Sequence, residues 1–504
     1  MVNILQSRLP KPKLFKSMFA LVLGARTAEM DRELPFAALL FTLLAASGVS
    51  IYESWKKLCS VSLLPTFRKE AREIVRQVEI LGYDPLTVMR KQAEKTKSKI
   101  YRDFLLGYIS SVRSGGNLAN YLRSKMRSIF DVQTDAAMQS VEQLGTLVEA
   151  YAVMLIVTLC TYILFIVFAT TSVFEPMKTS GAPGVSTPLV ILLVYVVTPL
   201  ISVFFMVIAH RERKSHLIGL RKPYYVAVLL AAIVSSFIAA TNLTPMLRHL
   251  TGPEIFPLVV TACLLTISIP SGVVYVKISL VNSDAENSMP SFLRDITESR
   301  KIGLSPEKSV IHAAKRTGYG RFTEVLRLVR SQMEWGISIR KIFANVKRKL
   351  QTWPVLVNFM ILVETIKIGG GSAAALEILT EYCEKQKDVE TNKTSLLRPY
   401  VLLAFIWSVL IALTTTMVTM TVYALTQISL SGTTTMPFEV MQEQVNLFSN
   451  GILLQCWLSG FFVGKVKEGS FAAGFKFSAM LVLTAHISLM LSQVFLGGLF
   501  GLVS

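Results

Sequence analysis

The side chains that most often carry catalysis or bind metals are few and scattered in this sequence. The five cysteines include no CxxC pair, and the run Gly369–Ser372 lacks the Lys-Ser/Thr ending of a phosphate-binding loop. The histidines form neither an HExxH motif nor a paired metal-ligand spacing; they are His210, His216, His249, His312 and His486. The residues therefore predict that the protein is not an enzyme and holds no metal or other cofactor.

Lysine and arginine form the recurring chemical pattern, and the net charge is +19. Clustered cations can guide an acidic protein surface into place, or they can contact anionic lipid as part of the positive-inside bias. The sequence leaves both interpretations open, and it contains no module that would bind nucleic acid. The candidate docking cations are Lys95, Lys97, Lys99, Arg102, Arg123, Lys125, Arg211, Arg213, Lys214, Lys347, Arg348 and Lys349.

Most of these cations belong to a stretch that occurs twice, from roughly Asp31 to Lys125 and from roughly Asp284 to Tyr382. Gly48 and Gly303 are separated by 255 residues (303 − 48 = 255), whereas Gly82 and Gly336 are separated by 254 (336 − 82 = 254). Gly115-Gly116 and Gly370-Gly371 are again separated by 255 (370 − 115 = 255). Either a local gap opens and closes again, or Gly369-Gly370 is the true partner of Gly115-Gly116. A repeat of this length indicates a duplicated domain.

Glycines divide each copy into short helices. Glycine adopts positive φ after a helix end, and a Ser or Asp two residues later caps the next helix. The copies should therefore be compact bundles of about six short antiparallel helices, with apolar residues at helical spacing, as in Ile74, Val75, Val78 and Leu81. The expected turn glycines are Gly48, Gly82, Gly115, Gly116, Gly303, Gly336, Gly370 and Gly371.

Apolar residues make up 52% of the chain, and its mean hydropathy of +0.50 indicates an integral membrane protein. Seven runs are long enough to cross a bilayer: 148–168, 190–209, 224–240, 255–276, 400–425, 447–466 and 477–502. The predicted fold class is thus all-α, a polytopic membrane protein with two duplicated helical bundles. The expected segments are a basic N-terminus (1–30), copy one (31–130), four spans (145–278), copy two (279–395) and three spans (399–504).

The links that are rich in Lys and Arg predict the orientation of the chain. Both copies, the link from Arg211 to Lys222 and the link from Lys465 to Lys476 are basic, whereas 172–186, 241–254 and 427–444 hold few cations. Every basic segment lies inside if both copies are cytoplasmic. Seven crossings then leave the C-terminus outside.

The duplicated order of glycine turns and the placement of the spans resemble the type II secretion F family, over nearly the whole chain beyond residue 30. That family provides the inner-membrane platforms of type II secretion, type IV pili and the archaellum. Four spans between the copies and three after the second are similar to its archaeal branch. Neither Ser111–Gly115 nor Ile366–Gly370 carries the acidic residue that the family often has at its third turn, so no role of that residue is transferred here.

The resemblance implies a platform that couples a hexameric assembly ATPase to the insertion of pilin-like or archaellin-like subunits, with membrane lipid as a further partner and a homodimer left open. A transporter or channel is the alternative, because internal repeats are common there too. The repeat in this chain is the soluble part, however, and the spans lack paired charges at mid-depth, which weakens that alternative. An adjacent gene for a secretion-type ATPase would distinguish the two.

Overall fold

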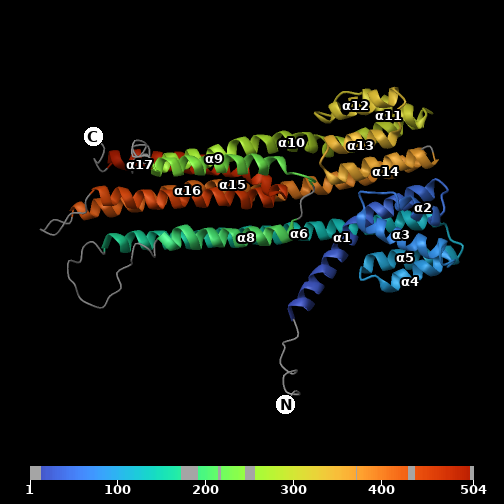
Figure 1. The fold of residues 1–504 in the computed structure, drawn as a ribbon, viewed down its shortest axis with the longest axis horizontal. Coiled ribbons are helices and arrows are strands. Elements are labelled where there is room, and N and C mark those ends of the chain that lie inside the picture. Colours follow the sequence, from blue (N-terminus) through green and yellow to red (C-terminus); the bar gives the residue numbers. More distant parts are fainter. Residues whose placement is uncertain are drawn as a thin grey trace, which may run out of the picture. The chain divides into compact units, whose positions relative to one another are not determined.

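The computed structural model describes the backbone of residues 13–171, 191–213, 217–243, 256–369, 372–428 and 438–499, and the side chains of most of them. The described residues form helices and no β-strand, which agrees with the predicted all-α class. The chain divides into two compact units (Figure 1). Unit 1 comprises residues 1–136 and 283–388 and so contains both copies, and unit 2 comprises residues 137–282 and 389–504.

Copy one begins with a long helix, continues through four short ones and ends in a second long helix. Ser50, Asp84 and Ser98 each cap the helix that follows by accepting a hydrogen bond from a backbone N–H of its first turn. The helices are α1 (Lys13–Ala46), α2 (Ile51–Leu58), α3 (Pro65–Glu79), α4 (Pro85–Lys95), α5 (Lys99–Arg113) and α6 (Leu118–Thr171).

Copy two has the same order of elements. Its helices are α10 (Phe256–Lys301), α11 (Pro306–Lys315), α12 (Phe322–Glu334), α13 (Ile339–Lys349), α14 (Trp353–Gly369) and α15 (Ala373–Ile428). The residues before α5 and α14 both donate a hydrogen bond to an acid on the first helix of their copy, Ser98 to Asp31 and Thr352 to Glu286. Ser98 and Thr352 are 254 residues apart (352 − 98 = 254), whereas the starts of α6 and α15 are again 255 residues apart (373 − 118 = 255). A gap therefore opens before Gly82 and closes before the last helix of the copy.

Unit 1 has two distinct ends. In copy one, Thr42 donates to the Leu122 carbonyl and Gln133 to the Asp31 carbonyl, so α1 and α6 are antiparallel. α6 runs parallel to α15, because Arg127 pairs with Glu381 and, four residues later on both helices, Asp131 pairs with Lys385. The same end of both copies is therefore the one where α6 and α15 leave the unit and α10 enters it. We call this the exit end, and the opposite one the far end.

The two copies contact each other through an aromatic cluster near the exit end. The Trp353 ring packs edge-on against Phe36, with centroids 4.7 Å apart, and its Nε1 donates to the Leu63 carbonyl at 3.2 Å. The Arg32 guanidinium lies 4.6 Å from the centroid of the same indole. This one tryptophan of copy two thus contacts both α1 and the α2–α3 turn of copy one.

A buried carboxylate caps a helix in copy one. Glu33 of α1 is 5% exposed and accepts hydrogen bonds from the Thr66 and Phe67 backbone N–H groups at 3.0 Å, at the start of α3. These bonds favour the ionised form, but burial outweighs them and raises the pKa of Glu33 above its ordinary value.

We expect this raised pKa to make the bundle more stable at mildly acidic pH. The folded state binds the proton more tightly than the unfolded chain, so stability is greatest below the unfolded pKa and is lost as pH rises through the folded one. Glu33→Gln should abolish that loss, and the difference in melting temperature between parent and variant should therefore change between about pH 4.5 and pH 7. Parallel melting profiles across this range would contradict the assignment.

Unit 2 contains the apolar parts of the long helices. Seven helices in the described part of the chain are long and apolar enough to cross a membrane, which confirms the predicted number of spans. Three of these helices, α6, α10 and α15, also belong to the copies. The other four are α8, α9, α16 and α17, and a short π-helical turn precedes α8. These elements are η1 (Leu193–Val197), α8 (Thr198–Glu212), α9 (Lys222–Leu243), α16 (Phe438–Glu468) and α17 (Phe471–Leu499).

Helices α16 and α17 form a tight hairpin in unit 2. A Cβ atom added at Gly460 would lie 2.3 Å from the backbone of Ser478, and one added at Gly464 would lie 2.4 Å from the backbone of Gly474. Glycines spaced four apart let two membrane helices approach this closely. The hairpin depends on the absence of side chains at these positions.

Two sequence expectations differ from the structure. The first and last helices of the copies are not short, because α6, α10 and α15 run without a break through the expected segment limits at 130–145, 278–279 and 395–399. Leu81 does not continue the buried pattern of α3, since that helix ends at Glu79 and the side chain is exposed.

Candidate functional site

The two strongest basic segments occupy the same turn in the two copies. Lys95 ends α4 and Lys99 begins α5, with Lys97 between them, and all three side chains are exposed. Lys347, Arg348 and Lys349 form the exposed last turn of α13, the helix equivalent to α4. Both turns lie at the exit end. Cations in the last turn of a helix also stabilise its C-terminal dipole, so part of this charge has a structural role.

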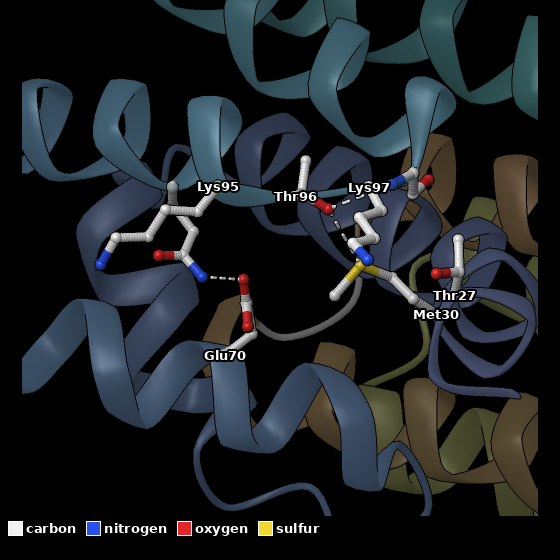
Figure 2. A pocket seen from close by; sticks show the side chains of 8 residues that line it. Thr27, Met30, Glu70, Lys95, Thr96 and Lys97 are labelled. Carbon is white, nitrogen blue, oxygen red and sulfur yellow. Dashed lines mark hydrogen bonds between the residues drawn. The ribbon is translucent and has the colours of Figure 1, made fainter. Parts of the chain in front are cut away.

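In copy one the basic turn forms the rim of a pocket of about 270 Å³. Figure 2 shows Glu70 between Lys95 on one side and Lys97, Met30 and Thr27 on the other. Glu70 is buried and accepts a hydrogen bond from Gln92. Because the pocket holds a carboxylate as well as the two ammonium groups, it is not a simple anion site.

Two of the other candidates take part in internal contacts. Arg102 is half-buried and donates to the Ala93 carbonyl at 3.2 Å and the Thr96 carbonyl at 2.9 Å, which joins the end of α4 to α5. Arg123 lies 3.9 Å from Glu381 of copy two, beside the closer Arg127–Glu381 pair, and so belongs to the contact between the copies. Lys125, on the same helix, is half-buried.

The remaining candidates belong to unit 2. Arg211 is exposed, Arg213 donates to the Val466 carbonyl at the end of α16, and Lys214 lies outside the described residues. Burial lowers the pKa of the Arg213 guanidinium. The contact between Arg213 and Val466 brings the two basic links together at one end of unit 2, and within the second link Lys476 pairs with Glu468 at 2.7 Å. His486 also has a partner in this unit, since its Nδ1 lies 3.1 Å from the hydroxyl of Thr261.

Five of the expected turn glycines have positive φ, between +67° and +94°. They are Gly48, Gly82, Gly115, Gly303 and Gly336. Gly116 does not adopt positive φ, and Gly370 and Gly371 lie outside the described residues. No atom lies within 4 Å of a Cβ built on any of the five, so the backbone conformation, and not lack of space, explains why glycine is suited there.

Sequence reasoning missed the apolar side chains beside these glycines. Leu81 and Tyr83 flank Gly82, and Trp335 and Ile337 flank Gly336, and all four are exposed. Their position in the sequence could have revealed them. All four lie beyond the helix ends, so they belong to no amphipathic helix face that would be buried.

A groove in unit 2 was also missed. It has a volume of about 510 Å³ and lies between α15 and α17, with Leu413, Met417, Ile487 and Leu491 among its lining residues. Hydroxyl side chains on α17 also line it, and one of them, Ser492, is buried with no hydrogen-bond partner for its Oγ among the described residues. An unpaired hydroxyl in an apolar groove can receive a backbone or side-chain group from another helix.

Comparison with known proteins agrees with the duplication. The model of a family described as type II secretion system (T2SS), protein F, matches residues 36–166 and 292–419, so each match begins in the first helix of a copy and ends in a span. An uncharacterised protein of Methanocaldococcus jannaschii is 21% identical over 516 residues, which cover 95% of this chain and 82% of that protein. No solved structure matches. The chain belongs to the type II secretion system F family, whose members are membrane platforms of secretion and pilus machinery.

Proposed function

We propose that this protein is the platform of a type IV pilus-like or archaellum machine, and that it couples a cytoplasmic assembly ATPase to the insertion of pilin-like subunits into a filament. Membership of the family supports the platform role, and the relative from an archaeon supports the archaeal branch. The meeting of the basic links at one end of unit 2 supports cytoplasmic bundles and an external C-terminus.

The observation that carries the proposal is the continuity of three helices. α6, α10 and α15 each contain a candidate span and, without a break, the first or last helix of a bundle. A displacement of a bundle by a motor can therefore pass along continuous helix to the spans, although Pro399 removes one backbone hydrogen bond from α15. The groove between α15 and α17 supports the other half of the proposal, because an apolar groove with an unpaired hydroxyl suits the helix of a subunit.

The test is binding of the purified assembly ATPase of the same organism to the full-length protein in neutral detergent. The platform role predicts saturable binding and a change in ATP turnover. A transporter or channel predicts neither.

The placement of the basic turns at the exit end supports a lipid role for their cations over motor docking. We expect that replacing Lys95, Lys97 and Lys99 by Glu, or Lys347, Arg348 and Lys349 by Glu, leaves ATPase affinity in neutral detergent unchanged. In nanodiscs with anionic lipid, hydrogen exchange of the α4–α5 turn should be slower than in neutral lipid for the parent but not for the Lys95/Lys97/Lys99 variant. This difference should shrink at high salt.

The opposite result is equally clear. If either triple variant weakens ATPase binding in neutral detergent, in a salt-dependent manner, these cations dock the motor.

A further inference from the structure

Exposed apolar side chains of unit 1 gather at one end. Among its described residues, the large apolar side chains that are more than half exposed are Ile80 (72%), Leu81 (59%), Ile302 (81%) and Trp335 (83%). All four lie in turns of the far end, beside Gly82, Gly303 or Gly336. The exit end instead carries the two basic turns described above and no apolar side chain exposed to this degree among the described residues. Unit 1 is therefore polarised, and its apolar end is the one from which no helix continues into a span.

The exposure recurs at equivalent positions of the duplication. Leu81 and Trp335 are 254 residues apart (335 − 81 = 254), as are Tyr83 and Ile337 (337 − 83 = 254), which is the separation of Gly82 and Gly336. Each copy thus presents an apolar residue on both sides of a positive-φ glycine. We call these two turns, Ile80–Tyr83 and Trp335–Ile337, the tips.

The tips are ordered turns that project from the helices of unit 1. Each is held between two helix ends, and the Gly336 N–H donates to the Met333 carbonyl while the Ile337 N–H donates to the Gln332 carbonyl. A Cβ at Gly82 or Gly336 would have no atom within 4 Å, so the turns stand clear of the bundle. Large apolar groups on a preformed turn lose little conformational entropy on binding.

Exposed acids and cations both lie beside the tips, but the acids have internal partners. Asp84 accepts a hydrogen bond from the Thr87 N–H at the start of α4, and Glu334 lies 3.7 Å from Arg330.

The charges left to face a partner are therefore mainly cations. The Lys91 Nζ lies 5.8 Å from the centroid of the Tyr83 ring, and Arg340 and Lys341 are exposed on the first turn of α13. Interfaces of this kind place aromatic or aliphatic anchors in pockets and set charges at the rim. The complementary surface is an apolar pocket with acidic residues around it.

We propose that the two tips are twin anchors that enter equivalent, acid-rimmed apolar pockets on two subunits of the oligomeric assembly ATPase. Two copies of one anchor call for two copies of one pocket, which a ring of identical subunits provides. This inference rests on the proposed function, because that function provides the partner.

The experiment measures binding of the purified ATPase to full-length variants in neutral detergent. Trp335→Glu and Leu81→Glu should each weaken binding by about 30-fold or more, the loss expected at an anchoring residue. Trp335→Lys should weaken it less than Trp335→Glu, because an acidic rim attracts the lysine. Leu106→Glu is the matched control, since Leu106 is an exposed apolar residue of α5 away from the tips, and it should bind like the parent.

A second readout uses the parent. Trp335 is the one exposed tryptophan of the five, so saturation with ATPase should reduce the quenching of tryptophan fluorescence by acrylamide. Variants that melt at the parent's temperature exclude misfolding as the cause of lost binding.

The outcomes separate the inference from the proposed function. ATPase binding by the parent with undiminished binding by Trp335→Glu and Leu81→Glu overturns the anchors and leaves the platform role intact. Loss of binding in only one of the two variants overturns the twin arrangement. Weaker binding by the Lys than by the Glu variant overturns the acidic rim. An ATPase that does not bind the parent refutes the proposed function.

Discussion

Replacing Gly460 by alanine is expected to destabilise unit 2 by about 1–3 kcal/mol, the usual cost of overpacking a close contact. Alanine is the better helix former by about 1 kcal/mol, so without the contact the substitution would be favourable. The close contact makes the net change in stability unfavourable, because the new methyl group would lie 2.3 Å from the backbone of Ser478, and the backbone cannot rotate away as a side chain can. The measurement is the melting temperature in detergent.

Gly145→Ala is the matched control in the same unit. There the new methyl group would meet the hydroxyl of Tyr400 at 2.6 Å, which is the end of a side chain and can move. The control should melt within a degree or two of the parent. Equal melting temperatures for Gly460→Ala and Gly145→Ala would show that α16 and α17 do not approach as closely as described.

Replacing Trp353 by alanine should cost about 3 kcal/mol, the low end for a packed tryptophan because this one is only partly buried. The variant loses the edge-on contact with Phe36, the cation–π contact with Arg32 and the hydrogen bond to the Leu63 carbonyl. Hydrogen exchange should speed up in the α2–α3 turn and at the start of α14, where the copies meet.

Trp335→Ala provides the contrast within the same copy. Its side chain is almost fully exposed, and a surface substitution of this kind changes stability by within about 0.5 kcal/mol. Trp353→Ala should therefore lower the melting temperature while Trp335→Ala should not. If the two variants melt alike, the copies are not held together by this tryptophan.

The sequence predicted the features that depend on local chemistry. Ser50, Asp84 and Ser305 cap helices because their side chains reach N–H groups three residues away, and that spacing can be read directly. The seven spans follow from length and apolar content alone. The helix continuity through α10 and α15 was not predicted, because a change from polar to apolar composition resembles a domain limit even where nothing ends the helix.

The candidate site was predicted less well, since its properties depend on tertiary contacts. Lys95 and Arg102 look alike in a basic run, yet one is exposed and the other joins α4 to α5. Trp335 and Trp353 are both tryptophans near a helix end, and only the packing of copy one on copy two makes one of them an internal contact. No local pattern distinguishes these cases.

The contact between the copies has a practical consequence for dissecting the protein. A fragment cut at the repeat boundary would uncover Phe36 and Phe130, which copy two now covers through Trp353 and Tyr382. Such a fragment would expose an apolar patch that is buried in the whole protein. Two fragments would bury this patch again by binding each other, or one fragment would bury it by binding an unrelated surface. A dimer of that fragment would result from the absence of copy two. The oligomeric state of the protein must therefore be measured on a chain that retains both copies.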